Sequence, residues 1–414
     1  MVDRTDVVVV GAGLAGLACA VRLQQQGIDT RLLEGSDVVG GRVRTDVIDG
    51  HLCDVGFQLL NPAYPAVRDR SLVDADGLHL QSFAAGVRVR RRDGDATLGD
   101  PRREPRLLAS TLRSGLLRPR ELAGLARWAA PILGGQRRIL GRDDVTLAGS
   151  LDTAGVHGPL REQVLEPFLA GVLADDTGAT SARYARLLIR WFLLGTPGLP
   201  RDGMRALPEH LATTLARPAE TGVPVTGIDR TSAGVTVRTA SGSIDARVVV
   251  VATDVHDAAE LHVVPDATPM SGLVTWWFST PEGMPHDRLL VVDGDRGPVV
   301  NTAVVSAAAP SYAPRGRDLV QVTTLAGAGL TDAAALAEAG RLWRTDVDGW
   351  DLLVRHDVVR SLPRAAPPLD LRRPSDVGGG VFVCGDHRDT PSIQGALASG
   401  QRAAGDVVTA LAGR

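Results

Sequence analysis

A glycine-rich segment near residue 11 constrains this chain more than any other feature. The segment Gly11-Ala12-Gly13-Leu14-Ala15-Gly16 follows an apolar run at 7–10 and opens a stretch with helical spacing at 14–26. A second expected strand at 30–33 closes on Glu34. Strand, glycine turn, helix, strand and acidic residue in this order predict a dinucleotide-binding unit of the Rossmann type.

The three glycines of this segment have different physical roles. Gly11 permits the tight turn, Gly13 lets the backbone approach a pyrophosphate, and Gly16 allows close packing of helix on sheet. The amino end of the helix then presents unsatisfied N–H groups to the diphosphate. Glu34 is expected to accept hydrogen bonds from the ribose hydroxyls. An ordinary glycine-rich turn is the alternative, and the full context disfavours it.

A second motif indicates FAD rather than NAD. Gly40-Gly41-Arg42 follows Glu34 closely and brings backbone and a guanidinium to another face of the diphosphate. Arginine suits this place because its planar fork binds phosphate oxygens in pairs. A solvated surface arginine is the weaker interpretation of Arg42.

With these motifs, Thr45 and the segment 54–56 make the chain resemble the flavin-containing amine oxidase superfamily. Within it, the sequence is most similar to the phytoene desaturase and protoporphyrinogen oxidase branch. Segments 381–386 and 392–400 resemble that family's final strand, flavin-binding turn and following helix. Segments 166–172 and 200–208 resemble its helical region, so that the resemblance covers the whole chain in outline.

The pattern along the chain predicts an α/β fold with an interrupted Rossmann-type FAD-binding domain. Further strands of that domain are expected at 234–238, 246–252 and 380–384. Between them, the stretch 100–215 has mostly helical spacing and 270–325 alternates as strands do. We therefore assign 1–75, 215–265 and 365–414 to the FAD-binding domain. The insertions 76–214 and 266–364 would form a second, α+β, substrate-binding domain.

Motifs and resemblance together define the expected cofactor site. By resemblance, Gly56, Phe57 and Gln58 would line the active face of the flavin. The turn at Gly385 and Asp386 would approach the ribityl chain, and a helix beginning near Gln394 would direct its positive end at the flavin N1–C2 edge. The complete set is Gly11, Gly13, Leu14, Ala15, Gly16, Glu34, Gly35, Gly40, Gly41, Arg42, Gly56, Phe57, Gln58, Val225, Gly385, Asp386, Gln394, Gly395 and Ala396. FAD is expected to be non-covalent, because Cys384 is best explained as a small buried strand residue.

Aromatic residues gather in the middle of a chain that is only 4% aromatic. They suggest an apolar pocket wall, although ordinary core is the alternative for any one of them. Trp276 and Trp277 are consecutive in an expected strand and must point to opposite faces. The pocket candidates are Trp191, Phe192, Trp276, Trp277 and Phe278.

The sequence contains no lysine, and all 45 basic residues are arginine. Amine-oxidising members of the superfamily typically place a lysine near flavin N5, so this absence weighs against amine oxidation. No catalytic base is assigned; Phe57, Gln58 and His387 are active-face candidates. No metal site is expected, because no histidine or cysteine spacing fits one.

Ten arginines lie within residues 102–142 against two acidic residues, with leucines between them. This stretch either lies on an anionic membrane or forms a solvated cationic face. Three cysteines without a disulfide pattern favour the cytoplasm, with the inner membrane face as the place of any peripheral contact. A net charge of −3 gives no reason to expect nucleic acid.

We therefore expect an FAD-dependent oxidoreductase that moves hydride from an apolar substrate (polyene, terpenoid or cyclic) to flavin N5, as a dehydrogenase, desaturase or oxidase. The alternatives are an amine or amino-acid oxidase and a redox-neutral flavin isomerase. The partner is a small lipophilic substrate, and neither the electron acceptor nor the oligomeric state follows from the sequence.

Overall fold

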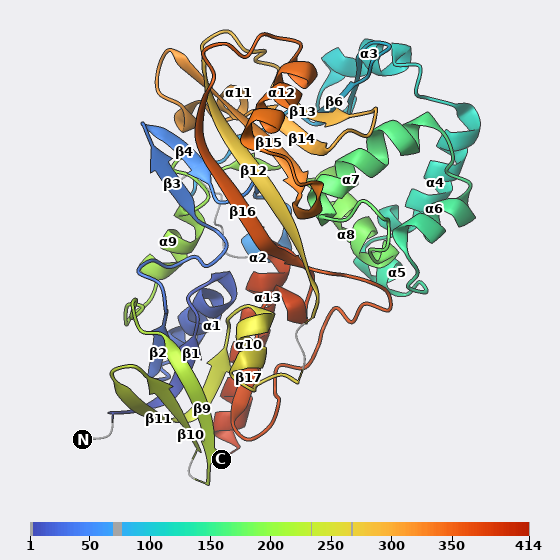
Figure 1. Cartoon of the computed structure of the whole chain (residues 1–414). Coiled ribbons are helices and arrows are strands. Elements are labelled where there is room, and N and C mark those ends of the chain that lie inside the picture. Colours follow the sequence, from blue (N-terminus) through green and yellow to red (C-terminus); the bar gives the residue numbers. More distant parts are fainter. Residues whose placement is uncertain (1–2, 69–76, 233, 266–267, 414) are drawn as a thin grey trace.

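The computed structural model describes residues 3–68, 77–232, 234–265 and 268–413, and it contains two large sheets (Figure 1). The first sheet has six strands in the order β2-β1-β11-β10-β9, with β17 also paired to β11. Strands β1, β2, β11 and β17 run parallel, whereas β9, β10 and β11 form an antiparallel meander. Their bounds are β1 Asp3–Val10, β2 Thr30–Leu33, β9 Val225–Thr231, β10 Gly234–Thr239, β11 Gly242–Val251 and β17 Val381–Val383.

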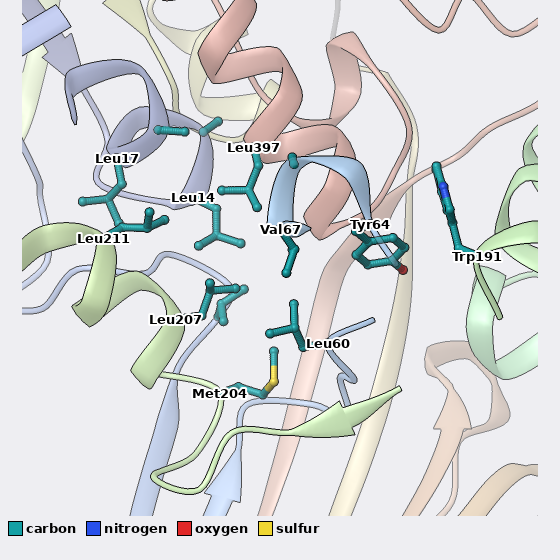
Figure 2. Packing of buried hydrophobic residues seen from close by; sticks show 14 of the residues in the cluster. Leu14, Leu17, Leu60, Tyr64, Val67, Trp191, Met204, Leu207, Leu211 and Leu397 are labelled. Atoms are coloured by element: carbon teal, nitrogen blue, oxygen red, sulfur yellow. The ribbon is translucent and has the colours of Figure 1, made fainter. Parts of the chain in front are cut away.

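Parallel strands buried on both faces explain why β1 and the end of β11 are continuous valine runs. Helices α1 and α13 pack on each other beside this sheet, and α9 and the short α2 extend their apolar contact (Figure 2). Leucines of α1, α9 and α13 meet there, together with Leu60 and Val67. The bounds are α1 Leu14–Gln25, α2 Pro65–Arg68, α9 Ala206–Thr213, α10 Val255–Glu260 and α13 Ile393–Ala412.

The second sheet has seven strands in the order β16-β12-β15-β14-β13-β6-β7. Most of its neighbours pair antiparallel, and only β13 and β6 run parallel. The bounds are β6 Gly86–Arg90, β7 Ala96–Gly99, β12 Met270–Pro281, β13 Leu290–Asp293, β14 Val299–Val304, β15 Arg317–Leu325 and β16 Asp351–Pro363. Helix α12, Asp332–Trp343, covers the face that carries Trp276 and Phe278.

A group of helices flanks the second sheet on one side (Figure 1). It comprises α3 Leu108–Arg113, α4 Pro119–Leu133, α5 Gln136–Leu140, α6 Leu147–Ala154, α7 Glu166–Leu173 and α8 Ala182–Leu194. A π-helical turn at Arg161–Leu165 leads into α7, which packs on β13, β14 and β15. The smaller elements are the hairpin β3 Thr45–Ile48 and β4 His51–Asp54, the pair β5 Gln81–Ser82 and β8 Gly198–Leu199, and the turn α11 Val305–Ala308.

The predicted α/β class and interrupted Rossmann-type architecture are confirmed, and the expected helices and strands appear close to their predicted bounds. Strand β16 was not predicted, and neither were β6 and β7. The edge strand β16 escapes detection because much of it faces solvent and carries charged residues, which blurs the apolar alternation. The proposed boundaries at 75, 76 and 266 lie outside the described residues.

Candidate functional site

A cavity of about 1220 Å³ runs between the first sheet and the helices that flank the second. Typical ligand pockets measure about 300–1,000 Å³, so this one has room for a dinucleotide and a second molecule together. One part is lined by glycine turns and by charged side chains of the segments that follow β2 and β17, including Glu34, Arg42 and Asp386. The other part is lined by α7, α8 and β14.

The glycine turn after β1 has the geometry that its sequence predicts. Gly11 has a φ of +99°, and a Cβ at Gly16 would come within 1.9 Å of the Gly11 carbonyl oxygen. A Cβ at Gly13 would meet nothing within 4 Å, because this residue borders the cavity. Gly13 also caps α1 without any side-chain hydrogen bond, which leaves the first N–H groups of the helix free for an anion.

Glu34 stands at the end of β2 with both carboxylate oxygens engaged. The Ala12 N–H donates to Glu34 Oε2 at 2.7 Å, and the Ser36 N–H and hydroxyl donate to Oε1 at 2.9 and 2.7 Å. These bonds hold the carboxylate beside the glycine turn at the cavity wall. An acidic group in this position suits the ribose hydroxyls of a nucleotide whose phosphates lie on α1.

Arg42 and Asp386 join the two distant halves of the cofactor motif. Arg42 Nη2 donates to Asp386 Oδ1 at 2.6 Å, and Nη1 donates to the Ser361 carbonyl at 2.6 Å. The Asp386 side chain is 5% exposed, against 32% for Arg42. Both residues line the cavity, so the guanidinium is available to an anionic ligand from its open side.

The turn at residues 385–392 places the amino end of helix α13 at the cavity. The Gly385 N–H donates to Ser399 Oγ at 3.1 Å, and Ser392 caps α13 by accepting from the Gly395 N–H. Gly395 is required sterically, because a Cβ there would lie 1.8 Å from the Thr390 carbonyl oxygen. The positive end of a 20-residue helix therefore faces the cavity.

Phe57 and Gln58 stand on the segment after β4 and line the cavity. Gln58 Nε2 donates to the Arg42 carbonyl at 2.9 Å, and Phe57 makes edge contacts with Phe83 and Trp277. Gly56 has a φ of +82°, which turns the chain so that Phe57 reaches the cavity.

Most of the predicted cofactor residues come together at this cavity. The lining set among them is Gly11, Gly13, Leu14, Ala15, Glu34, Gly35, Gly40, Gly41, Arg42, Phe57, Gln58, Val225, Gly385, Asp386 and Ala396. Four predicted residues stand behind the wall instead: Gly16, Gly56, Gln394 and Gly395. Gln394 is buried and accepts from the Ala66 N–H at 2.8 Å.

The substrate-pocket prediction needs correction for every residue except Phe192. Trp276 and Trp277 do point to opposite faces of β12, but neither lines the cavity. Trp276 donates to Asp332 under α12, beside Phe278, and Trp277 donates to the Asp54 carbonyl at 3.0 Å. Trp191 packs edge-on against Tyr64, with ring centroids 5.1 Å apart. These rings are core, as their small exposure indicates.

The apolar wall of the second half of the cavity comes from α7, α8 and the π-helical turn before α7, with single residues from β7, α4 and β13. Its apolar residues are Leu98, Leu125, Leu160, Val164, Leu165, Phe168, Val172, Leu188, Ile189, Phe192 and Leu290. Sequence reasoning favoured large aromatics, whereas helical spacing at 164, 165, 168 and 172 was the signal that could have located this wall.

His387 does not reach the cavity. It is 6% exposed, and its ring lies behind the glycine turn, where a Cβ at Gly385 would meet it at 2.6 Å. Burial lowers the pKa of His387 to about 4, so the ring is neutral near pH 7. A role for His387 as an active-face residue has no support from this position.

A buried carboxyl that sequence reasoning passed over lies at the junction of the two sheets. Asp54 accepts from Thr45 Oγ1 at 2.5 Å, from the Met204 N–H at 2.9 Å and from the Tyr312 hydroxyl at 3.0 Å. Burial raises its pKa to about 6 despite these bonds. Its position in the segment Asp54-Val55-Gly56 was the available signal.

The three cysteines, Cys19, Cys53 and Cys384, are all buried, and none lines the cavity. This agrees with a cofactor held without a thioether. No group of metal-ligating side chains occurs among the described residues. The described helices include none that is both long and apolar enough to cross a membrane.

The chain was compared with known proteins. The profile of the family described as flavin containing amine oxidoreductase matches residues 14–408. A putative flavin-containing monoamine oxidase of Mycobacterium tuberculosis is 30% identical over 268 residues, which is 60% of this chain and 56% of that protein. A phytoene desaturase (lycopene-forming) of a Paracoccus species is 51% identical over 49 residues, 12% of this chain and 10% of that protein.

Solved structures share the fold across nearly the full length. A putrescine oxidase double mutant has a TM-score of 0.74 at 18% identity and covers 98% of this chain and 99% of that one. A putative protoporphyrinogen oxidase from Exiguobacterium sp. 255-15 has a TM-score of 0.72 at 18% identity, with 99% of each chain covered. With the family match and the dinucleotide cradle described above, the chain belongs to the flavin containing amine oxidoreductase family and is an FAD-dependent oxidoreductase.

Proposed function

We propose that this enzyme oxidises an apolar substrate by moving hydride from a C–H bond to FAD, as a dehydrogenase, desaturase or oxidase. The carrying observation is the apolar wall of the second half of the cavity. Charged residues in that wall already have partners: Asp100 is bonded to Arg102, and Arg161 to Glu166. Arg103 donates to the carbonyls of residues 192 and 193. No free carboxylate among the described lining residues of this half is available to an ammonium group.

The bound FAD supplies a two-electron acceptor at its flavin ring. These residues of the chain would hold it: Gly13 and the amino end of α1 would bind the diphosphate, Glu34 would accept from the ribose hydroxyls, and Arg42 would bind the phosphates. The amino end of α13 favours negative charge beside it. Phe57, Phe168 and Phe192 line the cavity and would limit the access of water to the reacting C–H bond. Formation of a double bond would remove one hydrogen as hydride, which the flavin accepts, and one hydrogen of the neighbouring carbon as a proton.

Amine oxidation is the competing function, because relatives with amine oxidase names share the family and the fold. An amine substrate needs a route for its proton and, in such enzymes, usually a lysine near the flavin. The chain has no lysine, and the apolar wall offers no substitute. These two observations favour the apolar substrate. Redox-neutral isomerisation of an apolar substrate fits the same wall. It differs from oxidation because it transfers no net electrons to an acceptor.

The test is anaerobic reduction of the purified, FAD-loaded enzyme. Apolar compounds with activated C–H bonds (cyclic dihydro compounds and polyene precursors) are expected to bleach the flavin absorbance, and primary amines of matched size are not. Bleaching by amines alone would overturn the proposal. Product formation without any acceptor consumed would establish the isomerase instead.

We also propose that the surface of α3, α4 and α5, here called the basic face, contacts an anionic membrane. Its arginines 113, 118, 120, 137, 138 and 142 have no carboxylate within 4.0 Å among the described residues. Four leucines of α3 and α4 are exposed: Leu108, Leu112, Leu122 and Leu133. Thr111 and Leu125 of the same helices line the cavity, so a lipophilic substrate could pass from bilayer to flavin without crossing water.

Vesicle flotation tests the basic face. The enzyme is expected to float with anionic vesicles and to remain behind with neutral ones, and Leu112→Ser is expected to reduce flotation. Val359→Ser is the matched control, because Val359 lies on β16 and is 67% exposed, as is Leu112. Equal flotation of both variants, or none with either vesicle, would refute membrane contact.

A further inference from the structure

An asparagine interrupts the apolar wall of the substrate half of the cavity. Asn301 lies on β14, is 7% exposed and lines the cavity. It is paired across the ladder with Thr323 of β15, which is in turn paired with Thr275 of β12. Three polar residues therefore stand in one row across three adjacent strands.

A chain of hydrogen bonds along this row fixes the asparagine amide. Thr275 and Thr323 share a bond at 2.9 Å, and Thr323 Oγ1 donates to Gln321 Oε1 at 2.9 Å. Gln321 Nε2 then donates to Asn301 Oδ1 at 3.0 Å. Thr275, Gln321 and Thr323 are at most 1% exposed, so water does not compete for these bonds.

In this network the amide oxygen of Asn301 accepts a hydrogen bond, and its amide nitrogen, Nδ2, has no partner among the described residues. Asn301 Nδ2 donates a hydrogen bond to no described residue, and it is not fully enclosed by protein atoms. It lies against Gly171 of α7, where a Cβ would come within 2.3 Å of it, and Gly171 also lines the cavity. A larger residue at 171 would cover this nitrogen, whereas glycine leaves it accessible.

Resting on the proposed apolar substrate, we propose that Asn301 Nδ2 binds one acceptor oxygen, a carbonyl or hydroxyl, on that substrate. The substrate class is then an apolar body with one oxygen rather than a pure hydrocarbon. Because the network holds the amide in one orientation, the site discriminates by hydrogen bonding and not by charge. A substrate lacking this oxygen leaves a desolvated donor unpaired, which costs affinity.

The test measures binding of two non-reducing probes, a cyclic ketone and the cycloalkane of the same ring size, to the FAD-loaded enzyme by their effect on the flavin spectrum. The ketone is expected to bind about tenfold more tightly than the cycloalkane, as one hydrogen bond to an otherwise unpaired donor provides. In Asn301→Leu this ratio is expected to fall to about one. Asn301→Asp, which keeps the shape but loses the donor, is expected to lose the preference as well.

Two further variants separate the explanations. Gln321→Met frees the amide to rotate and is expected to reduce the ratio while FAD content stays at the wild-type level. Ile189→Leu, an apolar change in the same wall, is expected to leave the ratio unchanged. An unchanged ratio in both Asn301 variants, or a preference for the cycloalkane in wild type, would overturn this role. Because no hydride moves in these measurements, their outcome is independent of the reduction experiment.

Discussion

Replacing Gly400 by alanine tests how closely the two helices of the cofactor cradle must approach. Gly400 of α13 packs on the backbone of α1, and a Cβ there would lie 2.1 Å from the Ala15 carbonyl oxygen. Ordinary contacts begin at 3.4 Å, so the helices must separate by more than an ångström. The contact atom is backbone and cannot rotate away. Overpacking of this kind costs about 1–3 kcal/mol, from which a helix-propensity gain of about 0.5–1 kcal/mol is subtracted.

The matched control is Gly405→Ala on the same helix. A Cβ at Gly405 would meet only Arg22 Nη2, at 3.8 Å, so we expect a stabilisation of about 0.5–1 kcal/mol. The two variants are therefore expected to move the free energy of unfolding in opposite directions. Urea unfolding at fixed FAD and titration of the apoprotein with FAD measure the effect. We expect FAD to bind about tenfold more weakly to Gly400→Ala, because Ala15 lines the cavity. Parallel shifts in both variants would refute the close-packing argument.

Three further predictions concern charged and titratable groups. The pKa of Asp54 is raised to about 6, so its contribution to stability falls as pH rises from about 4 to 6. Asp54→Asn should remove this fall, which is up to about 3 kcal/mol in the free energy of unfolding measured with urea, and a pH dependence parallel to that of the wild type would contradict this. The pKa of His387 is lowered to about 4, so the contribution of the neutral ring to stability is complete above about pH 6.5 and is lost as pH falls toward 4. His387→Asn should remove this loss, which is also up to about 3 kcal/mol in the free energy of unfolding. Arg42→Gln leaves the Asp386 carboxylate unpaired, so it should lower the free energy of unfolding by about 3 kcal/mol or less and should also lower the FAD content of the purified protein. Adding Asp386→Asn should restore part of the stability, and additive effects of the two substitutions on the free energy of unfolding would argue against the pair.

Local sequence was sufficient for the cofactor half of the site. The steric demands at Gly16 and Gly395 come from backbone atoms five residues earlier, and Gly11 needs a positive φ, so the motifs themselves contain the information. The ion pair between Arg42 and Asp386 was not predicted, although both residues were, because it depends on how the two ends of the chain meet.

The substrate half was less predictable, since it depends on which face of each element turns inward. Alternation correctly placed Trp276 and Trp277 on opposite faces of β12. It could not indicate that one face is covered by α12 and the other by the segment that contains Asp54. The same limit applies to Asn301, whose role follows from neighbours 20 and more residues away along the chain.

The strand order of the first sheet has a consequence for the growing polypeptide on the ribosome. Strand β1 pairs with β11, so that Val7 must find Val248, and β17 joins only after residue 381. At about 5–20 residues per second, β1 and α1 are exposed for roughly ten to fifty seconds before their central partner is synthesised. During that time the valine edge of β1 is open to other chains. The amino-terminal segment is therefore a place where a chaperone would protect the growing chain, and slower elongation would lengthen the time during which it can aggregate.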